Sequence, residues 1–189
     1  MAFKLILSSL FLFLNISLLN AKNIKKKFND KQIELIQTTY NIGKSIVASN
    51  GMTFEKALTS ILLTETTAGK YIIGDSFNKD KTRRHLLKNS LGPFQMRIST
   101  VRVMSYKIPS LSFLKSKSDF WIMNRLLNDF AFGAILAGNY LKYNYEKTDF
   151  DYFKAISRYN GGNKNYRYYN AVMNNMGILN KLIKEKIIN

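Results

Sequence analysis

Apolar residues recur along much of this chain at intervals of three and four, the spacing that places them on one face of an α-helix. The first such stretch predicts a helix from Lys31, with Asp30 as its cap and Asn50-Gly51 after its end. Its apolar positions are Ile33, Ile36, Tyr40, Ile42 or Gly43, and Ile46. This helix should therefore pack through one face.

The next stretch predicts a helix that begins after a cap at Thr53 and stops at Ala68-Gly69. Its apolar face consists of Phe54, Ala57, Leu58, Ile61 and Leu62. A face this wide should bury most of the helix. Glu65 then stands in the last turn, beside an apolar wall.

The middle of the chain is less regular. Residues 71–73 are apolar and could form a short extended piece, whereas the polar residues 74–89 are typical of turns. A brief helix is expected after Pro93, because proline suits a first helical turn. This helix should end at Ile108-Pro109, because the residue before a proline disfavours helical backbone angles.

The last third predicts further helices. A long helix should run from a cap at Asp119 to about Tyr145, and its small residues indicate close helix–helix contact: Gly133, Ala134, Ala137 and Gly138. Shorter helices follow at 150–159, with Asp149 as its cap, at 166–176 and at 178–188. No run alternates long enough for a substantial sheet. The predicted fold class is therefore mostly α, with at most a minor β element in residues 70–90.

The first 21 residues stand apart from this pattern. Lys4 precedes an almost wholly apolar run from Leu5 to Leu19, and the small residue Ala21 comes before polar Lys22-Asn23. This order is typical of a secretory signal peptide. The alternative is a retained anchor helix, for which the run is short, because a span needs about 20 apolar residues. We therefore expect export to the periplasm or cell envelope, with residues 1–21 removed.

The rest of the chain is expected to be one unit of common domain size. Residues 22–52 would form a basic segment and the first helix, and residues 53–189 the main domain. The sequence has no cysteine, which excludes disulfides, a lipid-modified cysteine and a thiolate metal site. The single histidine, His85, excludes a histidine-rich metal cluster. We expect no cofactor, and a monomer.

The formal net charge of +17 favours an anionic partner. Export argues against nucleic acid, whereas the peptides of bacterial peptidoglycan carry carboxylates that would attract this chain. The lysines are scattered, however, so the charge is equally consistent with a compositional bias.

Three short segments carry the candidate chemistry. Glu65 follows an apolar helix face, and a carboxyl beside such a face resists ionisation, as a general acid near neutral pH must. In Ser90 to Met96, the pair Gly92-Pro93 predicts a turn that Phe94 can anchor and from which Gln95 can hydrogen-bond a sugar hydroxyl or acetamido group.

The third segment is Arg158 to Gly162, at a predicted helix end. Tyr159 can stack on a sugar ring and hydrogen-bond through its hydroxyl, and Asn160 offers a donor and an acceptor. For each of the three segments alone, an ordinary helix end or turn remains an alternative.

In this order, the segments resemble the soluble lytic transglycosylase family, whose catalytic domain has a goose-type lysozyme-like fold. The family pattern is Glu-Ser, Gly-Leu-Met-Gln, Gly-x-x-Tyr-Leu and Ala-Tyr-Asn-Ala-Gly. The matching residues here are Glu65-Thr66, Gly92-Pro93-Phe94-Gln95, Gly138-Asn139-Tyr140-Leu141 and Arg158-Tyr159-Asn160-Gly161-Gly162, and Thr100 stands where the family also has a threonine. The resemblance covers roughly residues 54–172.

This resemblance implies cleavage of the bond between N-acetylmuramic acid and N-acetylglucosamine. Glu65 would protonate the glycosidic oxygen and then accept the proton of the muramoyl C6 hydroxyl, which closes a 1,6-anhydro ring. The substrate's N-acetyl group would stabilise the cationic transition state, so no second carboxylate would be needed. The implied substrate-binding residues are Ser90, Phe94, Gln95, Tyr140, Tyr159 and Asn160.

The polar stretch 74–89 makes the interval from Glu65 to Gln95 longer than is usual in that family, which indicates an insertion. An insertion of this kind could form a lid or a surface for a partner such as secretion or envelope machinery. It leaves two candidates for the family's cleft serine, Ser76 and Ser90, of which Ser90 is preferred.

Two other functions remain open. A hydrolytic lysozyme on the same fold would need a second carboxylate to activate water, and Asp75 or Asp80 could supply it, although both stand in turn-like sequence. A basic helical module that binds cell wall without cutting it would explain the charge. It would leave Glu65, Gln95 and Tyr159 unexplained.

Overall fold

The computed structural model describes residues 27–75 and 85–189. Its elements are α2 (Asp30–Ser45), α3 (Glu55–Thr66), β1 (Ile73–Gly74), the 3-10 helix η1 (Leu86–Lys88), β2 (Ser90–Leu91), α4 (Ile98–Lys107), the 3-10 helix η2 (Pro109–Ser116), α5 (Asp119–Asn128), α6 (Phe130–Lys147), α7 (Tyr152–Tyr159) and α8 (Tyr166–Lys184). The prediction of a mostly α chain is confirmed, since β1 and β2 form the one small sheet of the described ranges. The predicted signal peptide lies outside these ranges.

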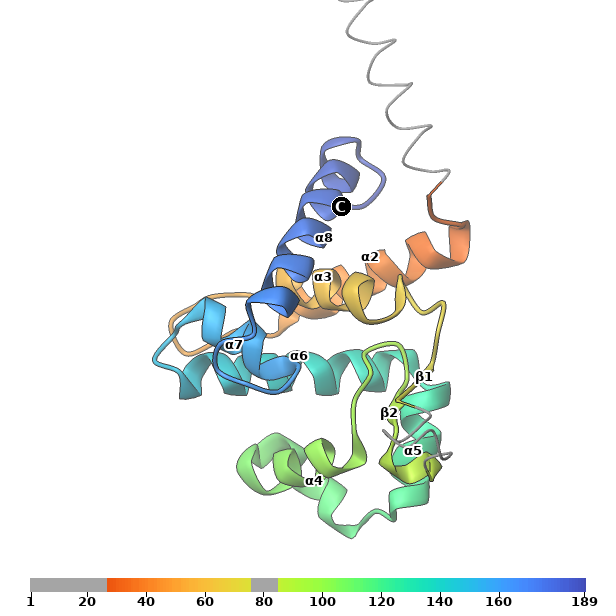
Figure 1. The fold of residues 1–189 in the computed structure, drawn as a ribbon, viewed down its shortest axis with the longest axis vertical. Coiled ribbons are helices and arrows are strands. Elements are labelled where there is room, and N and C mark those ends of the chain that lie inside the picture. Colours follow the sequence, from red (N-terminus) through yellow and green to blue (C-terminus); the bar gives the residue numbers. More distant parts are fainter. Residues whose placement is uncertain (1–26, 76–84) are drawn as a thin grey trace, which may run out of the picture.

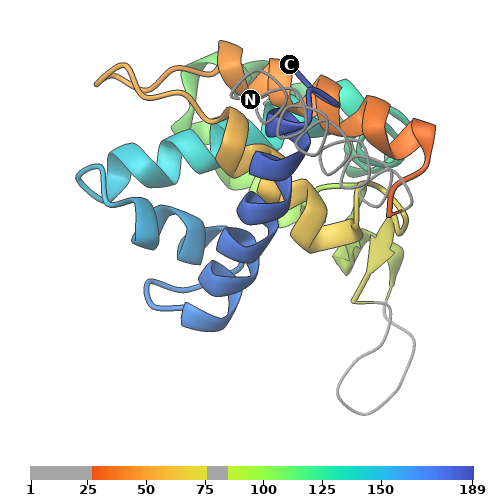
Figure 2. The same ribbon diagram turned by 90° about the horizontal axis from the view of Figure 1, so that it is seen from above.

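Helix α6 crosses the middle of the molecule (Figure 1). In that view α2, α3 and α8 lie above it, and α4 and α5 lie below it. Figure 2 shows the same molecule from above, with α8 crossing α3. Helix α3 packs extensively against both α2 and α8, so it is surrounded by its neighbours. No helix among the described residues has both the length and the hydropathy to span a membrane.

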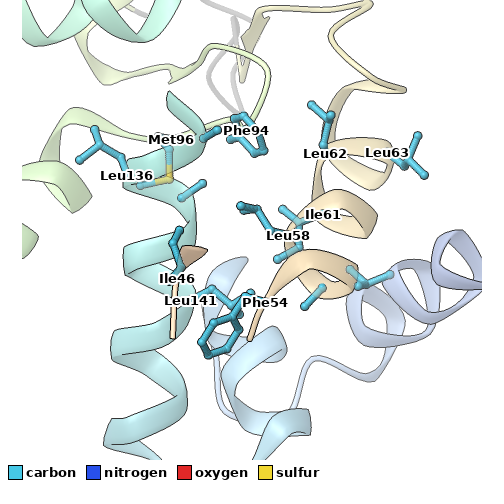
Figure 3. Close-up of a cluster of buried hydrophobic side chains, with 14 of the residues drawn as sticks. Ile46, Phe54, Leu58, Ile61, Leu62, Leu63, Phe94, Met96, Leu136 and Leu141 are labelled. Carbon is cyan, nitrogen blue, oxygen red and sulfur yellow. The ribbon is translucent and has the colours of Figure 1, made fainter. Parts of the chain in front are cut away.

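The main core lies between α3 and α6 (Figure 3). From α3, Leu58, Ile61 and Leu62 are fully buried, and Leu58 and Ile61 lie on the side of α3 that faces α6. Leu63 points to the other side of α3 and is also buried. The prediction that this helix is mostly buried is therefore confirmed, and Glu65 follows directly on its buried face.

Close contact between helices depends on the small residues of α6, as predicted. Gly133, Ala134, Ala137 and Gly138 are all buried. A Cβ atom at Gly138 would overlap the side chain of Ile46, which comes directly after α2. Glycine at this position thus lets the end of α2 approach α6.

The first two helix caps differ from the predicted ones by one residue. Asn29, not Asp30, caps α2, because its side chain accepts the backbone N–H of Gln32 while Gln32 accepts that of Asn29. Helix α3 has Phe54 at its N-cap and no side-chain cap. Thr53 instead pairs with Val47 in an isolated bridge, which fixes its backbone outside the helix.

The predicted long helix is divided in two. Asp129 ends α5 and caps α6, since its carboxylate accepts the N–H of Phe132. Further on, α7 is capped by Asp151 instead of Asp149. Asp149 and Phe150 both have positive φ angles, 53° and 63°, which no helix can include. Each of these turns contains more than one polar residue that can cap a helix. The sequence alone did not show which of them is the cap.

Three further boundaries differ. Helix α4 begins at Ile98 instead of at Pro93, because Gly92 to Gln95 form a turn. The predicted extended piece is shorter, since only Ile73 of residues 71–73 belongs to β1. Helix α8 continues through Gly177, where two helices were expected.

Candidate active site

A pocket of about 480 Å³ brings the three sequence segments together. Glu65 lies in it at the end of α3, Gln95 lies in it on the turn before α4, and Tyr159 and Asn160 lie in it at the end of α7. The other lining residues are Asp75, Ser90, Met96, Arg97, Ser99, Thr100, Tyr140 and Gly161. Of the predicted site residues that the structure describes, only Phe94 does not line the pocket.

The end of α3 is held from two sides, and this fixes the backbone at Glu65. The hydroxyl of Thr66 donates to the carbonyl of Pro93 at 2.8 Å and accepts the N–H of Gly69 at 2.9 Å. Thr67 follows in the left-handed conformation, with φ 52°, and its carbonyl accepts the side-chain amide of Gln32 at 2.7 Å. Glu65 is thus tied both to the Gly92–Gln95 turn and to α2.

Burial raises the pKa of Glu65 to about 7, against an ordinary value of 4.5. A hydrogen bond from Tyr168 acts in the opposite direction, because it stabilises the carboxylate, and the negative charge of Asp75 raises the pKa further. At neutral pH the side chain is therefore divided between its acid and its base form. A group in this state can both donate and accept a proton in one reaction cycle.

Tyr168 is a site residue that the sequence analysis missed. It lies on α8, and its hydroxyl donates to Oε1 of Glu65 at 2.6 Å. A second bond between the same helices runs from the amide of Asn175 to the hydroxyl of Thr64. Nothing in the sequence singles out Tyr168 from the chain's 11 tyrosines.

The turn from Gly92 to Gln95 depends on unusual backbone angles. Gly92 has a φ of 73°, and a Cβ there would overlap the backbone carbonyl of Leu126, so only glycine fits. Gln95 also has a positive φ, 50°, and its amide nitrogen donates to the carbonyl of Gly92 at 2.9 Å. The Gln95 side-chain carbonyl lies against Gly74, so that a Cβ at this position would displace it.

Tyr159 is built into the wall of the pocket. Its hydroxyl donates to the carbonyl of Phe94 at 2.9 Å and lies 3.3 Å from the sulfur of Met96. Its ring packs against Tyr140, with centroids 5.6 Å apart, and parallel to Tyr168, with centroids 6.5 Å apart. Burial raises its pKa well above the ordinary value of 10.0. The hydroxyl therefore holds the turn, and the ring is what Tyr159 offers to a ligand.

A charged cluster forms another part of the pocket wall. Asp75 Oδ2 accepts the Ser90 hydroxyl at 2.8 Å and pairs with Arg97 at 2.6 Å. Asp75 comes directly after β1 and Ser90 begins β2, so the paired strands bring them together. This places Asp75, one of the two candidates for a second carboxylate, in the pocket with Glu65. Ser76 and Asp80 lie outside the described residues.

The remaining two predicted residues differ in their surroundings. Phe94 is only 1% exposed and packs on Phe130 in the core, so its side chain anchors the turn and reaches no ligand. Asn160 is exposed at the end of α7, where its side-chain oxygen accepts the amide of Asn165 at 3.2 Å.

Within residues 27–75 and 85–189, no three histidine, aspartate or glutamate side chains gather in a way that could hold a metal ion. Comparisons with protein-family models, with curated proteins and with solved structures find no match to this chain.

Proposed function

We propose that this protein is a lytic transglycosylase that cuts the glycan strands of peptidoglycan between N-acetylmuramic acid and N-acetylglucosamine. The observation that carries the proposal is the state of Glu65. Its carboxyl has a pKa of about 7 in a polar pocket whose other walls come from the Gly92–Gln95 turn and the end of α7. This is the arrangement that a single acid/base group needs.

The proposed reaction has two proton transfers, both at Glu65. The protonated carboxyl gives its proton to the glycosidic oxygen as the bond from that oxygen to C1 of the muramoyl unit breaks. The resulting carboxylate then takes the proton of the muramoyl C6 hydroxyl, whose oxygen bonds to C1 and closes the 1,6-anhydro ring. No water is consumed, and Glu65 ends the cycle protonated as it began.

Other pocket residues would orient the sugar. Gln95 and Ser90 would hydrogen-bond its hydroxyl and acetamido groups, the rings of Tyr140 and Tyr159 would pack on its apolar face, and Asn160 would support the cleft at the end of α7. The proposal includes a goose-type lysozyme-like fold, export of the chain, and action as a monomer without a cofactor.

A hydrolytic lysozyme is the second candidate, and Asp75 favours it. Asp75 lines the same pocket as Glu65, so a water molecule between the two carboxylates could be activated for attack on C1. Against this role, Asp75 already accepts the Ser90 hydroxyl and pairs with Arg97. Both interactions engage Oδ2 of Asp75.

Digestion of purified peptidoglycan tests the proposal, with mass spectrometry of the released fragments. A transglycosylase leaves 1,6-anhydromuramoyl ends, whereas a hydrolase leaves reducing ends that are heavier by one water. Glu65→Gln should abolish release, and Glu34→Gln on the exposed face of α2 is the matched control. Equal digestion by the wild type and Glu65→Gln would overturn both enzymatic candidates. Binding to the wall without any digestion would favour a basic wall-binding module.

A further inference from the structure

A second pocket lies between α4 and α6. It encloses about 340 Å³ between the end of α4, the start of η2 and the second half of α6. Its charged and aromatic lining residues are Lys107, Lys142, Tyr143 and Glu146. No sequence motif drew attention to it. Its chemistry differs from that of the Glu65 pocket, because two lysines contribute to its walls.

The same two helices line both pockets. Helix α4 contributes Ser99 and Thr100 to the Glu65 pocket and Lys107 to the second one. Val103 lies on the same face between them and is 55% exposed. Thr100 and Lys107 are separated by about 10 Å along the helix, at 1.5 Å per residue. On α6, Tyr140 lines the Glu65 pocket and Tyr143, one turn further along the helix, lines the second pocket.

The second pocket favours an anionic group. Lys107 is exposed and Lys142 is half-buried, and no carboxylate pairs with either lysine among the described residues. The one carboxylate of the pocket, Glu146, accepts the backbone N–H of Ser49 at 2.9 Å, which directs it toward the neighbouring loop. The pocket thus holds two cations, one engaged carboxylate and the ring of Tyr143.

We propose that the pocket between Lys107 and Lys142 binds a carboxylate of a peptide that branches from the glycan strand held at Glu65. This inference rests on the proposed function. The glycan backbone held at Glu65 is largely uncharged, whereas the peptides attached to its muramoyl units carry carboxylates. A single strand could therefore occupy the Glu65 pocket with its sugars and the second pocket with a peptide. The protein would then cut peptide-bearing strands in preference to bare ones.

The test compares two forms of the same purified peptidoglycan, one intact and one stripped of its peptides by an amidase. The Lys107→Gln/Lys142→Gln double variant should reduce the preference for intact strands, measured as the ratio of the two kcat/KM values, by about fivefold. Lys31→Gln/Lys181→Gln removes the same charge from exposed positions on α2 and α8 and should keep the wild-type ratio. An equal ratio in the two double variants would overturn the inference.

The two proposals fail in different ways. The proposed function requires that the wild type release anhydro fragments from at least one of the two substrates. If neither intact nor stripped strands yield such fragments, the proposed function is overturned, and this inference with it. Cleavage of both substrates without a preference for intact strands would overturn the peptide site alone.

A binding measurement checks the inference without turnover. Calorimetry would compare Glu65→Gln with Glu65→Gln/Lys107→Gln/Lys142→Gln, each titrated with a soluble muropeptide that carries its peptide. Weaker binding by the triple variant, with no such loss for a peptide-free disaccharide, supports the inference. Identical dissociation constants for the muropeptide contradict it.

Discussion

The hydroxyl of Tyr168 donates a hydrogen bond of 2.6 Å to Oε1 of Glu65, and this joins α8 to the last turn of α3. The bond stabilises the carboxylate, whereas burial of Glu65 destabilises it. The pKa of about 7 is the balance of the two effects, with a smaller contribution from Asp75. A single oxygen atom of α8 therefore helps to set the proton affinity of the candidate acid.

Tyr168→Phe should raise the pKa of Glu65 above its present value of about 7, because the bond that it removes favours the charged form. If the reaction requires the protonated acid, kcat/KM falls as the pH rises through this pKa. The alkaline limb of the profile should therefore move to higher pH in the variant. A series of digestions between about pH 5 and pH 9 would measure the shift.

Tyr166→Phe is the matched control for this experiment. Tyr166 stands on the same helix, is 62% exposed and makes no hydrogen bond to Glu65. Its variant should keep the wild-type profile. A profile of Tyr168→Phe that stays in place or moves to lower pH would contradict the assigned role of the hydroxyl.

The burial of Glu65 should also make the protein less stable at high pH. Its pKa is about 7 in the folded chain and near 4.5 when exposed, so between these values the folded state holds a proton that the unfolded state has released. Stability from this group is complete below about pH 4.5 and is lost as the pH rises through about 7. Glu65→Gln cannot titrate, and above pH 7 it should be more stable than the wild type by about 3 kcal/mol.

Urea denaturation at pH 8 and at pH 4.5 measures this difference without any assumption about the substrate. The difference in the free energy of unfolding between Glu65→Gln and the wild type should be large at pH 8 and nearly zero at pH 4.5. Glu34→Gln should not open the same gap, since Glu34 is exposed on α2. A gap that is equal at both pH values would mean that Glu65 is not held in its neutral form.

Local patterns were sufficient to predict the mostly helical class and the burial of α3, but not where every helix begins and ends. The apolar face of α3 and the small residues of α6 are both in the core, because helical spacing alone decides which side of a helix is apolar. Boundaries were predicted less well, since the turns contain several polar residues that can cap. Asn29 and Asp151 cap helices for which Asp30 and Asp149 had been expected.

The site was predicted only where its residues follow a recognisable order. Glu65, Gln95 and Tyr159 were named from their segments, and the structure brings all three to one pocket. Tyr168 was missed, because its contact with Glu65 spans 103 positions and depends on how α8 crosses α3. The arrangement of Asp75 beside Ser90 likewise depends on the pairing of β1 with β2.

Thr66 should act as a positioning residue for Glu65. Thr66 is only 1% exposed. Its hydroxyl donates to the carbonyl of Pro93 and accepts the N–H of Gly69. Thr66→Val keeps the shape but leaves both groups without this partner, which should cost about 1–3 kcal/mol of stability. Because Glu65 would then be less well oriented, kcat should fall by roughly 10- to 100-fold with little change in KM.

The serine substitution separates orientation from packing. Thr66→Ser keeps the hydroxyl and loses only a methyl group, so it should retain most of the kcat that Thr66→Val loses. Steady-state kinetics and thermal denaturation of both variants would check this. Equal loss of kcat in the two variants would show that the methyl group, and not the hydrogen bonds, is what matters.

Gly74 should control the position of the Gln95 side chain. A Cβ at Gly74 would overlap the side-chain carbonyl oxygen of Gln95, which lies at the end of a flexible side chain and can move away. Gly74→Ala should therefore cost no more stability than the bond from the Gln95 amide to the Gly92 carbonyl, about 0.5–1.5 kcal/mol. Under the proposed function it should reduce kcat/KM by roughly 10-fold, because the displaced amide would no longer orient the sugar. Gly177→Ala is the matched control, since a Cβ there meets nothing and should stabilise α8 by about 0.5–1 kcal/mol without affecting activity.

A double-mutant cycle decides whether Gly74 acts through Gln95. Gln95→Ala removes the amide that Gly74→Ala displaces, so each single variant should lose activity for the same reason. The Gly74→Ala/Gln95→Ala variant should then lose no more kcat/KM than Gln95→Ala alone. Losses that multiply in the double variant would mean that Gly74 affects the pocket by another route, such as the position of Asp75, its neighbour in the chain.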